Sequence, residues 1–257
     1  MEKRSIKENI NVFVSGNGVS YSRLFPNHLI VNDLKKADIV MFTGGEDVSP
    51  LLYGDTVHPS THYNVTRDEN EEKDYWEALS LQLPMLGICR GAQFLTVMNG
   101  GKLIQNVDNH GKMHKIFFAN YKEGVEPLTP YFVNSTHHQM MYPYNLDPRK
   151  YKLIAFADNQ ASKYEVGLNH KDLFNFKNLK PKEPEIVFYP ESRCLAIQYH
   201  PEAMVGHMNI SLRDSLKKTY DVIEHTLLAE PFKHSKKQKT DTVKVLDKDF
   251  AAVAMLR

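Results

Sequence analysis

The sequence predicts an α/β fold of three layers, with helices on both faces of a mainly parallel central sheet. Short apolar runs alternate along the chain with segments of helical periodicity, as they do in sheets built from strand–helix units. One apolar run, residues 85–88, leads directly into Cys89. Gly87 and Gly91 lie on either side of this cysteine, and a segment with helical spacing begins directly after it. This arrangement predicts a nucleophile elbow at the carboxyl end of a strand, where the active sites of such sheets lie.

Apolar runs predict the strands, and amphipathic spacing predicts the helices. Strands are expected over residues 10–15, 28–31, 39–42, 85–88, 116–119, 153–157, 186–189 and 195–199. Helices are expected over residues 68–83, 91–98 and 211–228. In the first helix, Tyr75 and Leu79 share one face, and Pro84 stops it.

Length and composition indicate one domain over residues 1–230, followed by a tail over residues 231–257 that is partly disordered. The tail is either an extension that ends in a partner-binding helix or, as we favour, a helix packed on its own domain. The formal net charge of +1 argues against a nucleic-acid partner. Two cysteines, a start without a signal peptide and the lack of a run of ~20 apolar residues predict a cytoplasmic protein with no membrane partner.

Cys89 is the candidate nucleophile. The flanking Gly87 and Gly91 permit a tight strand-to-helix turn, and the helix N-terminus favours the thiolate. A lone cysteine after a strand is usually a small buried hydrophobe. Both glycines and the following helix argue against that interpretation here, whereas Cys194 lacks such flanks and is expected to pack in the core.

His200 and Glu202 are the candidate base and its orienting acid. They follow the apolar run 195–199 and are separated by Pro201. In an extended segment, residues two apart point the same way, and proline keeps the segment stiff. We therefore expect Glu202 to contact the imidazole of His200 and stabilise its cation, as the third group of a catalytic triad does.

Other residues suggest an oxyanion hole and argue against a metal site. Gly44 and Gly45 follow a strand end, and their amides, with the amide of Arg90, are expected to stabilise a tetrahedral oxyanion. His110 and His114 are four residues apart, but Gly111 weakens a helix there and no acidic or cysteine ligand lies nearby in the sequence. No metal and no cofactor are predicted.

These segments together resemble class I glutamine amidotransferases, and especially their γ-glutamyl hydrolase branch, which includes the γ-glutamyl-γ-aminobutyrate hydrolases. The resemblance covers about residues 40–205 and implies a flavodoxin-like sandwich. The matching segments are Gly44-Gly45-Glu46-Asp47-Val48-Ser49-Pro50, Tyr53-Gly54, Arg67-Asp68, Leu86-Gly87-Ile88-Cys89-Arg90-Gly91-Ala92-Gln93, Gly100-Gly101-Lys102-Leu103-Ile104-Gln105, Asn134-Ser135-Thr136-His137-His138-Gln139 and Gln198-Tyr199-His200-Pro201-Glu202.

The resemblance implies that Cys89 attacks the side-chain amide of glutamine or of a γ-glutamyl conjugate and forms a thioester. It also implies that the substrate's glutamyl group is held by five residues: Gln93, Ser135, Thr136, His137 and His138. The stretch Asp158–Val166 departs from the family pattern, since it lacks an Asp-Gly followed by a Glu-rich strand and leaves only Glu165 as a remnant. This departure leaves the substrate open.

Three functions remain as alternatives. The first is a glutaminase that passes ammonia to a separate synthetase or ligase partner. The second is a free-standing hydrolase of γ-glutamyl amines or peptides, which Arg67-Asp68 and His137-His138-Gln139 favour slightly. The third is a catalytically silent binding or regulatory module, which the intact Cys, His and Glu set makes the weakest.

Overall fold

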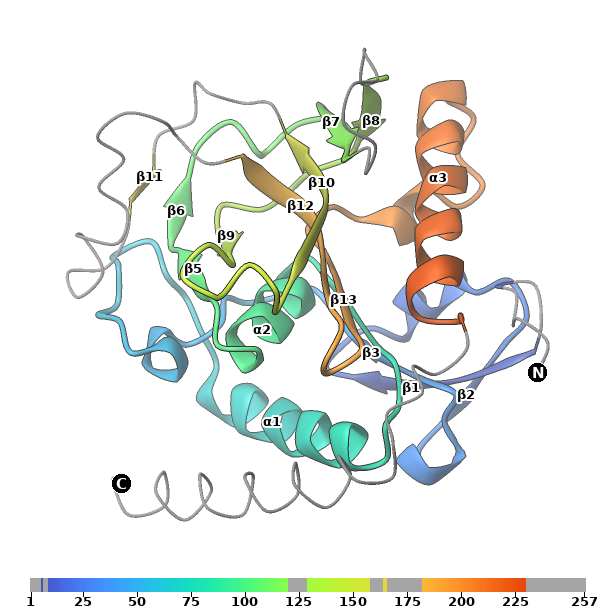
Figure 1. Cartoon of the computed structure of the whole chain (residues 1–257), viewed down its shortest axis with the longest axis horizontal. Helices are drawn as coiled ribbons and strands as arrows, with labels where there is room; N and C mark the ends of the chain where they lie inside the picture. The colour runs from blue at the N-terminus through green and yellow to red at the C-terminus, as the bar shows by residue number, and fades with distance from the viewer. Residues whose placement is uncertain (1–5, 7–8, 120–128, 158–163, 166–181, 230–257) are drawn as a thin grey trace.

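The computed structural model describes residue 6 and residues 9–119, 129–157, 164–165 and 182–229. Its central sheet has the strand order β2-β1-β3-β4-β13-β12-β10-β7-β8 (Figure 1). In that order the strands are His28–Val31, Ile10–Ser15, Ile39–Phe42, Met85–Ile88, Cys194–Ile197, Glu183–Tyr189, Lys152–Ala157, His114–Phe118 and Tyr131–Val133.

The first five strands of that order pair in parallel, and the remaining pairs are antiparallel. In the parallel part, β3, β4 and β13 are neighbours, so their carboxyl ends meet at one edge of the sheet. This edge carries the loops that begin at Thr43, Cys89 and Gln198. The sequence does not distinguish the antiparallel strands, from β12 to β8, from the parallel strands, because short apolar runs have the same pattern in both kinds of strand.

Helices cover both faces of the sheet, which confirms the predicted α/β sandwich. On one face, α1 (Val65–Ser80) and α2 (Arg90–Met98) pack against alternate strand residues such as Val40 and Phe42. On the other face, α3 (Ile210–Thr226) shares a core with the intervening residues. Strand residues that point to both faces are buried, and each buried large apolar side chain stabilises the fold by roughly 1.5–3 kcal/mol.

The long helices and the principal strands lie where the sequence predicts them, apart from their ends. The first helix begins at Val65 rather than at Asp68, because the Asn64 side chain accepts a hydrogen bond from the Arg67 amide at 3.2 Å and caps it. It ends at Ser80, before Gln82 with its φ of 58°. Five short strands were not predicted: β5 (Lys102–Ile104), β6 (Asn106–Val107), β8, β9 (Met140–Tyr142) and β11 (Tyr164–Glu165).

The suggestion that Glu165 is the remnant of a Glu-rich strand is wrong. Glu165 lies in β11 (Tyr164–Glu165), which pairs with β6 away from the main sheet. The glutamate-bearing strand next to β13 is β12, which carries Glu183 and Glu185.

Two further expectations concern the tail and the membrane. The tail over residues 231–257 lies outside them, so its interpretation stays a prediction. Among the helices that are described, none has the length and apolar character needed to cross a bilayer.

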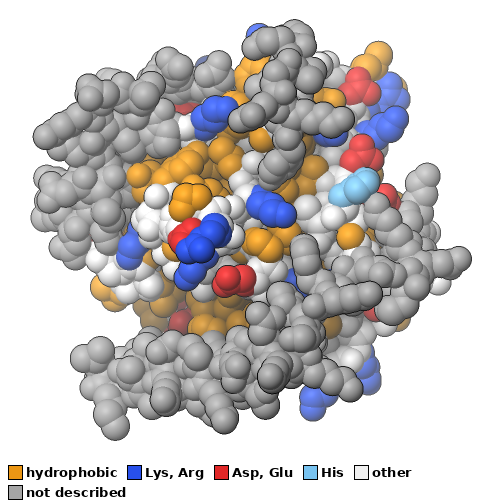
Figure 2. Space-filling model, viewed as in Figure 1, with side chains coloured by type: hydrophobic (Ala, Val, Ile, Leu, Met, Phe, Trp, Pro, Cys, Tyr) orange, Lys and Arg blue, Asp and Glu red, His pale blue; other side chains and the backbone are white. Residues whose placement is uncertain are grey.

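On the face shown in Figure 2, Lys and Arg side chains lie close to Asp and Glu side chains over the described part of the surface.

Gly91→Ala should destabilise the fold. A Cβ at this position would lie 2.1 Å from the carbonyl oxygen of Phe42, a backbone atom that has no room to move. Overpacking of this kind should lower the free energy of unfolding by about 1–3 kcal/mol in urea denaturation. Gly111→Ala is the control, since nothing lies within 4 Å of its Cβ; equal losses in both variants would contradict the packing argument.

Candidate active site

The turn between β4 and α2 holds Cys89 in an unusual backbone conformation, with φ 54° and ψ −110°. Positive φ is rare for a non-glycine residue and persists only where the surroundings enforce it. The enforcement comes from close packing: a Cβ at Gly87 would lie 2.4 Å from the carbonyl oxygen of Gly91. The Cys89 amide also donates to the Ile197 carbonyl at 2.8 Å, which ties the turn to β13.

The two cysteines differ in their surroundings. Cys89 precedes the first turn of α2, where its carbonyl accepts from the Ala92 and Gln93 amides at 3.0 and 3.1 Å. Cys89 lies at the edge of the sheet where the loops meet, and the residue is 8% exposed. Cys194 lies within β13 and is fully buried, and this burial raises the pKa of its thiol to about 12. Cys194 is therefore the inert thiol of the two.

His200 lies between Cys89 and Glu202. Its imidazole interacts with the Cys89 side chain, which raises the pKa of the ring, and its Nδ1 lies 2.7 Å from Glu202 Oε1. The expectation that residues 200–202 stay extended is wrong: η5, a 3-10 helix over Pro201–Met204, begins directly after His200. The turn still brings the carboxylate to the imidazole, and the two side chains are only 16% and 7% exposed.

The environment of His200 favours its charged form. Burial alone would lower the pKa of this imidazole, but the hydrogen bonds to Cys89 and Glu202 outweigh burial and raise the pKa to about 10. An imidazolium held next to a thiol at neutral pH is the arrangement needed to protonate a departing amine.

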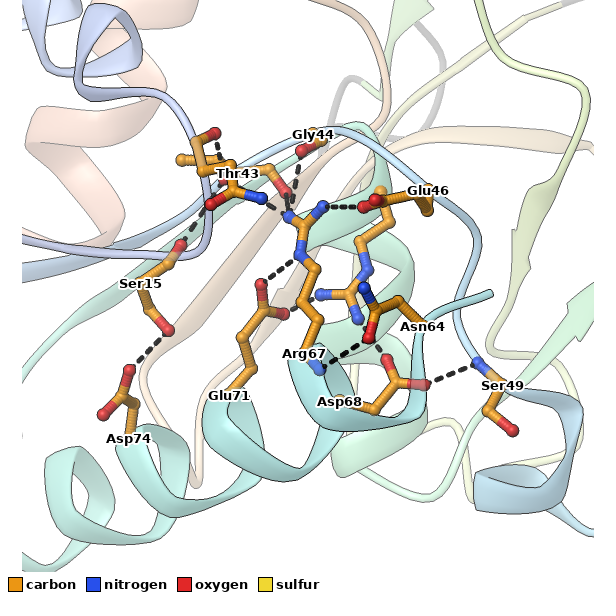
Figure 3. Close-up of polar contacts among 12 residues, drawn as sticks. Ser15, Thr43, Gly44, Glu46, Ser49, Asn64, Arg67, Asp68, Glu71 and Asp74 are labelled. Carbon is orange, nitrogen blue, oxygen red and sulfur yellow. Dashed lines mark hydrogen bonds and ion pairs between the residues drawn. The ribbon is translucent and has the colours of Figure 1, made fainter. Parts of the chain in front are cut away.

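The Gly44-Gly45 loop is clamped by Arg67 of α1 (Figure 3). Arg67 Nη2 donates to the carbonyl oxygens of Thr43 and Gly44 at 3.0 and 2.9 Å, and Nη1 lies 2.9 Å from Glu46 Oε2. A Cβ at Gly45, where φ is 137°, would come within 2.2 Å of the guanidinium. Only glycine permits this approach, so the second glycine of the loop is required by the clamp rather than by a turn alone.

A second arginine, Arg90, is linked to Arg67 through a shared carboxylate. Arg90, the first residue of α2, forms ion pairs with Asp68 and Glu71 of α1, and all three side chains are almost fully buried. Glu71 also pairs with Arg67 at 2.8 Å. Burial and the neighbouring Arg67 lower the pKa of Arg90 to about 10, whereas Asp68 and Glu46 oppose this shift. The network fixes the cysteine-bearing helix to α1 and hence to the glycine loop.

Tyr21, which the sequence analysis did not single out, also lies at this site. Its ring centroid is 6.2 Å from that of His200, and its hydroxyl oxygen would lie 2.4 Å from a Cβ at Gly44. Burial and the nearby Glu202 and Cys89 side chains raise its pKa to about 12. Tyr21 belongs to η1 (Val19–Leu24), a short 3-10 helix that follows β1, and its glycine-flanked segment has no pattern that marks a functional residue.

The loop after β8 lies beside α2. The Gln93 side chain donates to the Gln139 carbonyl at 2.9 Å, and the same carbonyl accepts from His137 Nδ1 at 2.8 Å. Ser135 Oγ donates to the carbonyl oxygen of His110. Gln93, Ser135 and His137 are buried and engaged in these bonds, so the structure gives them the role of holding the loop. Burial lowers the pKa of His137 well below its usual value.

Two residues of that loop are more open. Thr136 is exposed, and His138 is partly exposed, with its Nε2 3.1 Å from Asp47 Oδ1. The hydrogen bond to Asp47 raises the pKa of His138. Because Asp47 follows the Gly44-Gly45 loop directly, this contact joins the two loops.

The geometry can be compared with known proteins. The family description "Peptidase C26" matches residues 18–158, more than half of the chain. The chain belongs to the peptidase C26 family. The matched residues include the glycine loop, the cysteine turn and the loop that carries His137.

Two relatives and one solved structure extend the comparison. Protein PB2B2.05 of Schizosaccharomyces pombe, provisionally named a glutamine amidotransferase, is 42% identical over 188 residues, which cover 68% of this C26 chain and 66% of the relative. NtpR of Enterococcus hirae is 29% identical over 182 residues, 66% of this chain and 68% of NtpR. A glutamine amidotransferase structure from Thermotoga maritima is 15% identical, with a TM-score of 0.47 and coverage of 93% and 97%.

Glu202→Gln should lower the pKa of His200, because it removes the carboxylate charge and keeps the shape. Histidine NMR titration should show the wild-type imidazolium losing its proton near pH 10 and that of the variant losing it closer to 6.5. The stability that this pair contributes is present below about pH 6.5 and is lost as the pH rises through about 10, so the wild-type Tm should fall more over that window. Glu191→Gln, an exposed position, should behave as wild type; an unchanged His200 titration in Glu202→Gln would refute the coupling.

Arg67→Lys should loosen the glycine loop. Lysine keeps the charge but lacks the planar fork that bonds Glu71, Glu46 and two carbonyls at once. We expect a loss of about 2 kcal/mol in the free energy of unfolding, which corresponds to a Tm lower by roughly 4–8 °C. Arg213→Lys, on the exposed side of α3, is the matched control and should leave Tm unchanged.

Proposed function

We propose that the chain hydrolyses a γ-glutamyl amide bond through a γ-glutamyl thioester on Cys89, with His200 as the acid–base group and Glu202 as its orienting carboxylate. The observation that supports this proposal most directly is that His200, at the carboxyl edge of the sheet, interacts with the Cys89 side chain and lies 2.7 Å from Glu202 Oε1. Membership in the peptidase C26 family agrees with a hydrolase.

In the first half of the reaction, Cys89 Sγ attacks the amide carbonyl carbon as the thiolate of a thiolate–imidazolium pair with His200, and the carbonyl electrons move onto the carbonyl oxygen. The amides of Gly44, Gly45 and Arg90 are the proposed donors to this oxyanion, and each such donor contributes about 10²–10³ in rate. When the intermediate collapses, His200 gives its proton to the departing amine or ammonia. Its raised pKa favours this acid role, since the ring is charged before the substrate reacts.

In the second half, His200 is neutral and takes a proton from water. The hydroxide oxygen adds to the thioester carbon, the carbon–sulfur bond breaks, and glutamate leaves with the thiolate restored. Glu202 stabilises the imidazolium that forms again. The cycle balances without a redox partner and needs no cofactor.

For the substrate's glutamyl group, the proposal divides the five expected residues by their burial. Thr136 and His138 are open enough to contact a ligand directly. Gln93, Ser135 and His137 are bonded within the protein and position the loop. If the enzyme acts alone, the released amine or ammonia leaves into solvent. If the enzyme supplies ammonia, a separate synthetase accepts it.

Both cysteines are unpaired, which fits a reducing compartment, so we place the reaction in the cytoplasm.

Cys89→Ala should abolish hydrolysis of glutamine and of γ-glutamyl amines by the purified chain, because no other thiol can form the thioester. A diazoketone analogue of glutamine should label the wild type at Cys89, located by mass spectrometry. Cys194→Ala is the matched control and should keep both activity and labelling, since that thiol lies buried in β13. Persistent turnover in Cys89→Ala would refute the mechanism, and absence of both turnover and labelling in the wild type would favour the silent module. Release of amine without a partner protein would exclude a strict role as an ammonia supplier.

A further inference from the structure

A buried group of histidines and glutamates lies beside the loop that carries His137. Ligand atoms of His110, His114 and Glu185 all lie within 4.8 Å of one another. His110 and His114 flank the start of β7, and Glu185 comes from β12, 71 residues after His114. The argument that no acidic ligand accompanies the two histidines is therefore wrong, because it considered only neighbours in the sequence.

Several polar atoms in this group are buried without a hydrogen-bond partner. They are His110 Nδ1, Glu185 Oε2 and, on the adjoining loop, His137 Nε2. The three residues are only 1%, 0% and 5% exposed. A buried polar atom that has no partner loses hydration without compensation, at about 1–3 kcal/mol each. Three of them in one place indicate a missing common partner.

The other nitrogens of these rings are already held. His110 Nε2 lies 3.0 Å from Glu183 Oε2, and His137 Nδ1 lies 2.8 Å from the Gln139 carbonyl. His114 Nδ1 lies 3.4 Å from the Lys112 carbonyl. An acceptor that binds one ring N–H fixes the tautomer and leaves the other nitrogen as an electron-pair donor. This is how histidines are prepared for metal binding, with a carboxylate or carbonyl behind each ring.

The spacing fits a zinc-sized ion. Zinc lies about 2.0–2.2 Å from nitrogen and oxygen ligands, so two ligands of a tetrahedral ion are about 3.4 Å apart. Glu185 Oε1 is 3.7 Å from His110 Nδ1 and 2.8 Å from His114 Nε2. The ring centroids of His110 and His137 are 4.6 Å apart, so a third imidazole lies next to the group.

Charge favours a cation at the same place. Within the described residues, the ion pairs of Glu185 are both with histidines, His110 and His114. A fully buried carboxylate needs a positive partner, and a divalent ion supplies more positive charge than a single imidazolium. A divalent ion would neutralise Glu185 and be bound by the atoms that now lack partners.

We propose that His110, His114 and Glu185 bind a structural zinc ion, with Glu183 orienting His110 and His137 lying beside the site. The three ligand side chains are at most 11% exposed, so the proposed role of the ion is to hold these strands together. It joins β12 to the start of β7, beside the loop that also contacts α2 through Gln93. The site does not depend on the proposed hydrolase activity.

The full chain, expressed with zinc in the medium, should carry about one zinc per chain by mass spectrometry of the metal. After removal of the metal, Co²⁺ should restore a site with the visible absorption of tetrahedral cobalt. Zn²⁺ at 100 times its Kd should raise the Tm of the metal-free chain by roughly 5–10 °C. These measurements do not use activity, so a failed hydrolase assay leaves them intact.

His114→Ala should lose the bound metal, whereas His225→Ala, on the exposed side of α3, should retain it. Glu183→Gln should weaken Zn²⁺ binding by about 10–100-fold while the chain stays folded, as expected for an orienting partner. If His114→Ala does not fold, the wild-type titration and Glu183→Gln still decide the question. Wild-type protein that contains no zinc, binds neither Zn²⁺ nor Co²⁺ and shows no change in Tm would overturn the proposal.

Discussion

The strained turn at Cys89 is the constraint on which the rest of the site depends. A non-glycine residue with φ of 54° returns to a relaxed conformation unless its surroundings prevent it. Here the prevention is steric, through the contact of Gly91 with the Phe42 backbone, and polar, through the hydrogen bond to Ile197. The same contacts place the sulfur at the start of α2, with its position fixed relative to β3 and β13.

That placement explains why residues far apart in sequence meet. Strands β3, β4 and β13 are adjacent, with Phe42 paired to Gly87 and Ile88 paired to Ile197. Each strand therefore ends at the same height, and the three following loops deliver glycine amides, a thiol and an imidazole to one place. The paired arginines of the α1 and α2 network then lock these loops to one another. The sheet supplies position, and the buried ion pairs supply rigidity.

The parts of this arrangement that the sequence predicts are those with a local cause. Two glycines around Cys89 and an apolar run before it are enough to predict the elbow, and His200-Pro201-Glu202 is visible for the same reason. What escaped prediction has non-local causes. Tyr21, which follows β1, lies beside Gly44, which follows the neighbouring strand β3, and Glu185 of β12 reaches His114 of β7 past the intervening strand β10. The strands that were missed have two or three residues, too few for a period to be measured.

The two buried clusters of acids differ in how their charge is balanced. Asp68 and Glu71 lie against two guanidinium groups, which carry permanent charge and enough donors to bond both carboxylates. Glu185 has only imidazoles as ion-pair partners among the described residues, and the nitrogens and oxygen that remain there are unbonded. The first cluster contains enough positive charge within the polypeptide to balance its carboxylates. The second has donors arranged around a place where positive charge is needed, and a bound cation satisfies the charge and the unpaired atoms together.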